Sequence, residues 1–131
     1  MARNIIDLPT LGDDGKLYRD TAVDMVESLI PNPWESCHAP DLLELENGDL
    51  LCCWFAGSRE GNADISIAVA RLPADAEQWE QPVIVSDDPT RSEQNPSLFQ
   101  NPNGDIWLMY TAQAAKKPDD NSDDSLQGTA E

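Results

Sequence analysis

His38 is the only histidine of the chain, and it is the residue best suited to proton transfer. An imidazole titrates near neutral pH and can act as general acid, general base or ligand. Asp64 could supply a second group for acid/base chemistry. We therefore take His38 and Asp64 as the candidate catalytic residues. The alternatives are a structural histidine hydrogen-bonded to a neighbouring loop, and an aspartate that accepts backbone N–H groups in its own loop.

Four further polar side chains fit the recognition of an acidic or hydroxylated ligand: Arg59, Glu60, Arg91 and Asn95. A guanidinium grips a carboxylate at two points. Arg91 and Asn95 also suit sugar hydroxyl groups. These four are the candidate substrate-binding residues. Solvated ion pairs and loop bracing use the same residue types, so both structural alternatives stay open.

Residues 40–56 and 96–112 are two copies of one pattern, offset by 56 residues from Pro40 to Pro96. Both contain Pro, Leu, Asn-Gly-Asp, an aliphatic residue, an aromatic residue and Ala in the same register. Repeats of this kind, with short strands inside each unit, are typical of β-propellers, whose blades are four-stranded sheets of about 40 to 50 residues. We expect an all-β fold: a partial β-propeller with one full four-stranded antiparallel blade and part of a second.

Alternation and turn residues place the elements of these blades. Strands are expected at 23–30, 42–45, 50–55, 65–70, 83–85, 98–99 and 106–110, with hairpin turns at Asn47-Gly48 and Asn103-Gly104. The polar stretches 57–62 and 87–95 are expected to be loops. Because antiparallel strands reverse direction, both loops should lie at one end of the sheet. Loops on a rigid scaffold often carry function, so this end is the expected site, with His38 and its repeat partner Gln94 at the mouth.

The length of the chain suggests an incomplete domain. A propeller needs about four to eight blades, and the 131 residues hold one full blade and the start of another. We expect a lead-in at 1–20, propeller blades at 21–113 and an acidic flexible tail or loop at 114–131. The exposed sheet edges of such a fragment could pair with the missing blades or with another copy of the chain.

The charge balance limits the partners. The formal net charge is −17, with 8 basic and 25 acidic residues. Such a surface repels phosphate backbones, so nucleic acid is not an expected partner. No apolar run is long enough for a signal peptide or a membrane span, so we expect a cytoplasmic protein without a membrane partner.

The three cysteines do not form a recognisable metal motif. Cys52 and Cys53 are neighbours in an expected strand and should point to opposite faces. A site built from Cys37, His38 and one of this pair lacks C-x-x-C spacing. We therefore expect buried free thiols, no metal and no cofactor.

Several ordered motifs resemble the sialidase-like proteins with bacterial neuraminidase (BNR, or Asp-box) repeats. They are Ser-Cys-His-Ala-Pro at 36–40, Leu-Glu-Asn-Gly-Asp-Leu-Leu at 45–51, Trp-Phe-Ala-Gly-Ser-Arg-Glu-Gly at 54–61 and Asp-Ile at 64–65. The second copy supplies Asn-Pro-Ser-Leu-Phe at 95–99 and Gly-Asp-Ile-Trp-Leu-Met-Tyr at 104–110. The resemblance covers residues 30–113.

This resemblance implies a six- or seven-bladed propeller that acts on glycans. Its members are exo-acting sialidases, related glycoside hydrolases and, in some branches, lyases on acidic sugars. By resemblance, His38, Arg59 and Asp64 occupy patterned positions of the subgroup, and in some branches a histidine near the mouth is the catalytic base. The expected function is therefore a fragment of a sialidase-like glycan-processing enzyme, with an acidic glycan as partner and with the isolated fragment itself inactive.

The chain also departs from the family pattern. The Asp-box, Ser-x-Asp-x-Gly-x-Thr-Trp, survives only as a degenerate segment at 75–79, and the Arg-Ile-Pro motif of sialidases is missing. Two alternatives follow. One is a non-catalytic propeller module that binds glycans or proteins, and the other is an inactive truncated product.

Overall fold

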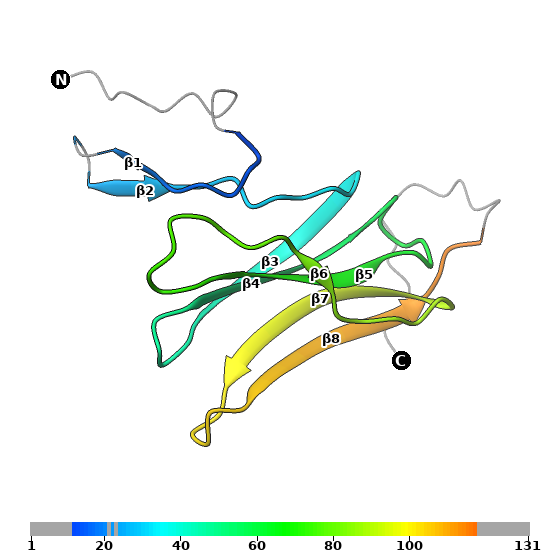
Figure 1. The fold of residues 1–131 in the computed structure, drawn as a ribbon. Helices are drawn as coiled ribbons and strands as arrows, with labels where there is room; N and C mark the ends of the chain where they lie inside the picture. Colours follow the sequence, from blue (N-terminus) through cyan, green and yellow to red (C-terminus); the bar gives the residue numbers. More distant parts are fainter. Residues whose placement is uncertain (1–11, 21, 23, 118–131) are drawn as a thin grey trace.

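The computed structural model describes residues 12–20, 22 and 24–117, and within these ranges it contains strands and turns but no helix (Figure 1). The strands are β1 (Tyr18–Asp20), β2 (Met25–Glu27), β3 (Ser36–Glu44), β4 (Leu50–Gly57), β5 (Ser66–Leu72), β6 (Val83–Ile84), β7 (Arg91–Gln100) and β8 (Ile106–Ala114). They form three antiparallel sheets, β1–β2, β3–β4–β5–β6 and β7–β8. The predicted all-β class and the four-stranded antiparallel blade are confirmed.

β4 is buried along almost its whole length because layers cover both faces of the β3–β6 sheet. On one face Cys53 and Phe55 pack with Ile67 of β5 and with Leu98 of β7. On the other face Cys52 and Trp54 pack with other residues of the blade, and Leu17, Ile30 and Trp34 lie against them from the N-terminal part. A strand covered on both sides reads as a continuous apolar run rather than as an alternating one.

The hairpin turns of the two repeat copies have the same backbone conformation. In the first copy Gly48 N–H donates to Leu45 O at 2.8 Å, and Leu45 N–H donates to Asp49 O at 2.8 Å. Gly48 has a φ of 86° and the equivalent Gly104 a φ of 89°. Glycine reaches this left-handed region without the cost of a Cβ, and it closes the three-residue loop of a hairpin with a bulge. The expected turn positions are therefore confirmed.

The same irregularity also occurs in both copies. The β3–β4 register shifts by one residue between His38 and Asp41, and the β7–β8 register shifts between Gln94 and Ser97. The bulged residue has a positive φ in each case, 52° at Ala39 and 51° at Asn95. One extra residue bends the strand locally and redirects the side chains beside it.

The first strands of the two copies are neighbours. Asp41 Oδ2 in β3 accepts Leu98 N–H at 2.8 Å and Ser97 Oγ–H at 3.1 Å, both from β7. Asp41 and Ser97 occupy the same repeat position. Equivalent strands that lie side by side are what successive blades around a common axis require.

Several strands are longer than the sequence predicted, above all β3, β7 and β8, the last of which continues to Ala114. β7 begins at Arg91, so the expected loop at 87–95 is wrong for its last five residues. The backbone there pairs despite its polar side chains, and Glu93 N–H also donates to Ile65 O at 3.0 Å. β3 likewise begins at Ser36 rather than at 42. β1 lies inside the segment expected to be a lead-in, and residues 118–131 of the expected tail lie outside the described residues.

Candidate functional site

The loops predicted to share one end of the sheet do lie together. Ser36, which opens β3, is opposite Gly57, which closes β4. The loop that follows Gly57 reaches β7 through the Glu93–Ile65 hydrogen bond already described. It also reaches the segment after β8, because Lys116 N–H donates to Gly61 O at 2.8 Å. His38, Arg59, Asp64 and Arg91 all belong to these adjoining segments, which we call the loop end.

His38 is exposed and held by a ring contact. It lies opposite Phe55 in the β3–β4 register, and the two rings stack with centroids 5.5 Å apart and an interplanar angle of 24°. Stacking fixes the plane of the imidazole through its face and leaves the ring nitrogens at the edge. This orientation suits proton transfer to a ligand at the loop end.

Asp64 is exposed and braces its own loop. Its carboxylate accepts Ser58 N–H at 3.0 Å on one oxygen and Ser58 Oγ–H at 2.9 Å on the other. Asn62 Nδ2 donates in turn to Ser58 Oγ at 3.1 Å. This is the second of the two roles that the sequence left open. In this geometry Asp64 orients the loop that carries Arg59.

Arg59 and Glu60 lie in the tight turn that follows β4. Arg59 O accepts Asn62 N–H at 3.0 Å, and Arg59 is exposed. Gly61 has a φ of 91°, and an added Cβ there would lie 2.7 Å from Lys116 Cε. The segment after β8 therefore packs against this turn, and Lys116 is part of the loop end. Sequence reasoning missed Lys116; its signal was a lysine pair in a chain with only three lysines.

Arg91 and Asn95 are both engaged within the second hairpin. Arg91 Nη1 donates to Ala112 O at 3.0 Å. Asn95 is exposed at the bulge, where its Nδ2 lies 3.5 Å from Thr111 Oγ1. These contacts brace the second hairpin, and both residues belong to the loop end.

A buried polar cluster lies directly beneath the loop end. Ser86 Oγ–H donates to Glu93 Oε2, and Ile67 N–H donates to Ser86 Oγ at 2.7 Å. Burial, and then the nearby Glu93 carboxylate, raise the pKa of Tyr110. Glu93 is only 2% exposed.

Gln94 belongs to the same buried layer. It is 3% exposed, its Nε2 donates to Ser92 Oγ at 2.9 Å, and its Oε1 accepts from Gln113 Nε2 at 3.0 Å. The expectation that Gln94 borders the mouth is therefore wrong, because its amide is used inside the second hairpin. Its repeat partner His38 is exposed.

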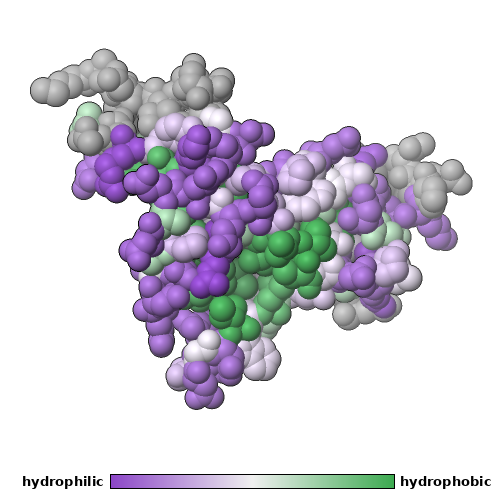
Figure 2. Space-filling model, in the orientation of Figure 1, coloured by the Kyte–Doolittle hydropathy of each residue, from purple (hydrophilic) through white to green (hydrophobic). Residues whose placement is uncertain are grey.

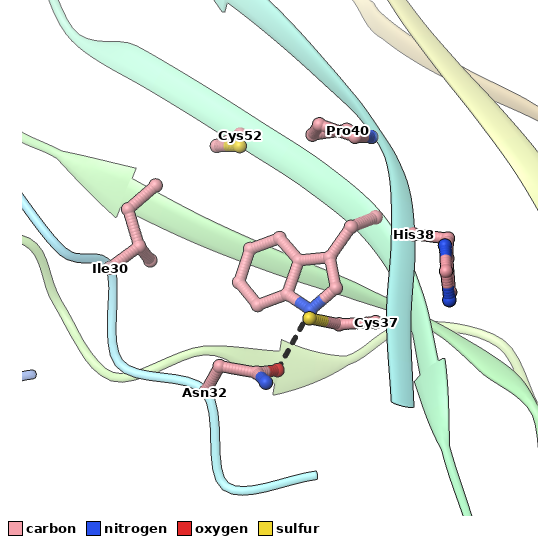
Figure 3. Close-up of a pocket in the computed structure, with 7 residues that line it drawn as sticks. Ile30, Asn32, Cys37, His38, Pro40 and Cys52 are labelled. Atoms are coloured by element: carbon pink, nitrogen blue, oxygen red, sulfur yellow. Dashed lines mark hydrogen bonds between the residues drawn. The ribbon is translucent and has the colours of Figure 1, made fainter. Parts of the chain in front are cut away.

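A cavity of about 220 Å³ lies beside β3, on the side toward which Cys37 points (Figure 3). It is lined by Ile30, Asn32, Cys37, His38, Pro40, Cys52 and Trp54. Cys37 and His38 leave β3 on opposite sides. Trp54 Nε1–H donates to Asn32 Oδ1 at 3.2 Å, so the one polar group of the indole is satisfied. The cavity is mainly apolar and would accept a small apolar group.

The cysteines are free thiols, as expected. Cys52 and Cys53 are buried on opposite faces of β4, and burial raises the pKa of each thiol to about 11. Cys37 is exposed, so the expectation that all three thiols are buried is wrong; it lies near the start of β3, at the wall of this open cavity. Within residues 12–117 as described, no group of three His, Cys, Asp or Glu side chains could hold a metal ion. A helix long and apolar enough to cross a membrane is likewise absent from this described part.

Comparison with known families identifies the repeat. The BNR repeat-like domain family matches residues 48–126, which are 79 of the 131 residues. No curated protein and no solved structure matches the chain. The matched stretch includes β4, the whole loop end after it, β7 and β8. The chain belongs to the BNR repeat-like domain family.

Proposed function

We propose that the chain is the N-terminal part of a sialidase-like propeller that processes glycans and binds an acidic sugar at the loop end. The observation that carries the proposal is that most of the candidate residues at the loop end lie within the stretch that matches the BNR family. The matched stretch supplies two guanidiniums, Arg59 and Arg91, and the carboxylate of Asp64 to the loop end. His38 precedes the matched stretch and reaches the same end from the adjoining strand β3. The reaction class is exo-acting glycoside hydrolysis or, on uronic acid linkages, elimination.

Each candidate residue has a role that its environment supports. His38 is the general acid/base, because its ring plane is fixed and its edge is exposed. Arg59 binds the sugar carboxylate from the loop that Asp64 holds in shape. An imidazole can protonate a leaving oxygen in its acid form, or remove a proton next to a carboxylate in its base form.

The remaining substrate contacts come from the rim of the loop end. Glu60, Arg91 and Asn95 supply the hydrogen-bonding groups that sugar hydroxyls need. Arg91 and Asn95 keep fixed positions through Ala112 and Thr111, so they present a preorganised rim. Preorganised groups contribute more to binding than mobile ones because less freedom is lost.

A non-catalytic glycan-binding module is the second candidate. It is favoured by the contacts of Asp64, since both carboxylate oxygens are used inside the loop. In that case the loop end binds sugar without turnover, and Asp64 acts only on the loop.

The test uses the longest natural form of the protein and, separately, the 131-residue chain. Hydrolysis and elimination are screened on sialyl, rhamnosyl and uronyl glycosides, and uronic acid binding is followed by NMR chemical shifts. His38→Ala is expected to lower turnover of the long form at least 100-fold while binding stays within a few-fold, because general acid/base catalysis contributes about 10² to 10⁴ in rate. Arg59→Ala is expected to weaken binding of the acidic sugar.

Asp75→Asn, in the turn at the far end of the sheet, is the matched control and should leave both readouts unchanged. Turnover that survives His38→Ala would remove the catalytic assignment. Sugar binding without any product would establish the binding module instead. Absence of both binding and turnover in the long form would contradict the loop end as a carbohydrate site.

A further inference from the structure

Basic residues gather at the loop end of this acidic chain. Arg59, Arg91 and Lys116 are three of the 8 basic residues, against 25 acidic ones. Figure 2 shows mainly hydrophilic surface on the side where β8 ends in Figure 1, whereas apolar surface lies in the middle of the same face. The region that holds the candidate ligand contacts is therefore polar and locally rich in positive charge.

Lys116 lies between the two arginines. Its N–H donates to Gly61 O at 2.8 Å, two residues after Arg59. Ala114, two residues before it, is paired with Arg91. One turn and one strand end thus bring Lys116 near both arginines. Charges of one sign that lie close together repel each other, so an anionic ligand stabilises such a group.

Gly61 lets the lysine stem cross the turn that carries Arg59. A Cβ added to Gly61 would lie 2.7 Å from Lys116 Cε, 2.8 Å from Cδ and 3.0 Å from Cγ, closer than ordinary van der Waals contact. Three consecutive carbons of the stem therefore lie over bare backbone. The ammonium is bonded directly to Cε, so its charge lies over the turn 59–62, which the Asn62 N–H to Arg59 O bond closes. Lysine stems often pack in this way while the charged head stays in water.

The neighbouring cations are less suited to hold a second negative charge. Arg91 has an acidic neighbour, Asp88, whose pKa is lowered chiefly by hydrogen bonds from Thr90 and, to a smaller degree, by the charge of Arg91. Lys117 is exposed, whereas Lys116 is half-buried against the turn. A charge that is already held in place loses less freedom on binding than a mobile one.

We propose that the loop end binds a glycan with negative charges on at least two of its sugar residues, and that Lys116 selects for the second charge. This inference rests on the proposed function, in which Arg59 binds the carboxylate of one acidic sugar. The ammonium of Lys116, over the same turn, meets the charge on the adjoining sugar. The net charge of −17 repels such a ligand from the rest of the surface and favours binding at the loop end.

The test measures binding to the longest natural form of the protein by NMR chemical shifts. Two pairs of probes are compared, galacturonic acid with its α-1,4-linked trimer and sialic acid with its α-2,8-linked trimer, and maltotriose is the neutral reference. For at least one pair the trimer should bind at least fivefold more tightly than the monomer. Maltotriose should bind more weakly than either acidic trimer.

Lys116→Met removes the charge but keeps an unbranched stem that can lie over Gly61. It should weaken the trimer about fivefold, near the upper limit for one exposed charge pair, and leave the monomer within twofold. Lys116→Arg keeps the charge and should keep the preference for the trimer. Lys117→Met is the matched control, because it removes the same charge from the adjacent residue, and it should leave every probe within twofold.

Salt separates a charge effect from a packing effect. The difference in trimer affinity between Lys116→Met and Lys117→Met should shrink as sodium chloride rises from about 50 to about 500 mM, because salt screens charge and leaves packing intact. A difference that does not change with salt would show that Lys116 only braces the turn, and the inference would be wrong.

Other outcomes also contradict it. Equal affinity of monomer and trimer in both pairs would overturn the inference while the proposed function stands. So would a loss in Lys117→Met as large as that in Lys116→Met, or an equal loss for monomer and trimer. Absence of binding by every acidic probe would instead contradict the proposed function, and the inference would fall with it.

Discussion

The two repeat copies share their backbone and differ in what surrounds them. Residues 40–56 and 96–112 have the same turn, and the same bulge, at Ala39 and at Asn95, directly precedes each of them. Yet Leu51 is 8% exposed whereas its partner Trp107 is 52% exposed, and Cys53 is 0% exposed whereas Met109 is 55% exposed. β4 has a strand on each side and a layer on each face, while β8 has β7 alone among the described strands. The local sequence sets the backbone, and the neighbours set the burial.

The largest difference between the two copies is expected when the side chain at one repeat position is truncated to alanine in each of them. Leu51→Ala should lower the free energy of unfolding by about 2 to 5 kcal/mol, because it leaves a cavity in a covered core. Trp107→Ala removes a larger side chain but should cost only about 1 kcal/mol, most of it from the lost stack on Phe99 at 5.8 Å. Urea unfolding measures both. Equal losses would mean that the second copy is as covered as the first.

The next effect concerns Asp41 and its partner Ser97. Asp41→Ala removes the carboxylate that accepts from Leu98 N–H and from Ser97, and it should cost about 1 to 3 kcal/mol, because a backbone donor is left without its partner. Ser97→Ala removes one of these bonds and should cost about 0.5 to 1.5 kcal/mol. Amide hydrogen exchange at Leu98 gives a local readout. Faster exchange in Ser97→Ala than in Asp41→Ala would contradict the assignment.

A smaller effect is expected at the paired turn glycines. Gly48→Ala and Gly104→Ala each force a Cβ into the left-handed region, at a cost of about 1 kcal/mol. Gly48→Ala should be worse by a few tenths, because its Cβ would lie 3.3 Å from Ala74 Cβ, whereas the Cβ at Gly104 meets nothing closer than Gln100 Nε2 at 4.0 Å. Thermal unfolding of the two variants side by side tests the ranking.

The smallest effect depends on pH and belongs to the first copy. The pKa of Asp49 lies below its ordinary value, chiefly because of the hydrogen bond from Arg71, and the pKa of Asp41 is lowered chiefly by Leu98 N–H. Between these lowered values and the ordinary value of 3.8, the unfolded chain binds more protons. The contribution of both groups is therefore complete above pH 3.8 and is lost as the pH falls through the folded-state values.

The measurement is the melting temperature between pH 6 and pH 2. Asp41→Asn with Asp49→Asn should flatten the acid limb of the curve, whereas Glu44→Gln removes an exposed carboxylate and should change it less. An acid limb of unchanged slope in the double variant would show that other carboxylates govern acid unfolding.

Much of the fold could be predicted because turn residues and repeat register are local signals. Asn47-Gly48 and the apolar run of β4 were enough to place the first hairpin. The early start of β7 was missed because Ser92 and Glu93 are polar, and polar residues in a row predict a loop when strands are sought by apolar alternation. The register of the repeat held a better signal, since Ser92 matches Ser36 at the start of β3.

The site was harder to predict than the fold. The order of strands was enough to bring the loop holding Arg59 and Asp64 to the same end as His38. Burial, however, depends on contacts between copies, so sequence did not distinguish the exposed His38 from the buried Gln94 at the same repeat position. The contacts of Asp64 within its loop and the packing of Lys116 against Gly61 depend on side-chain geometry that spacing alone does not give.

The shared bulge also gives both units the same shape. Ala39 and Asn95 match at the offset that relates the whole repeat, so the first strand of each unit bends at the same point of the register. Strands with the same bend follow one curve, and this lets equivalent strands of neighbouring units pack side by side along their length.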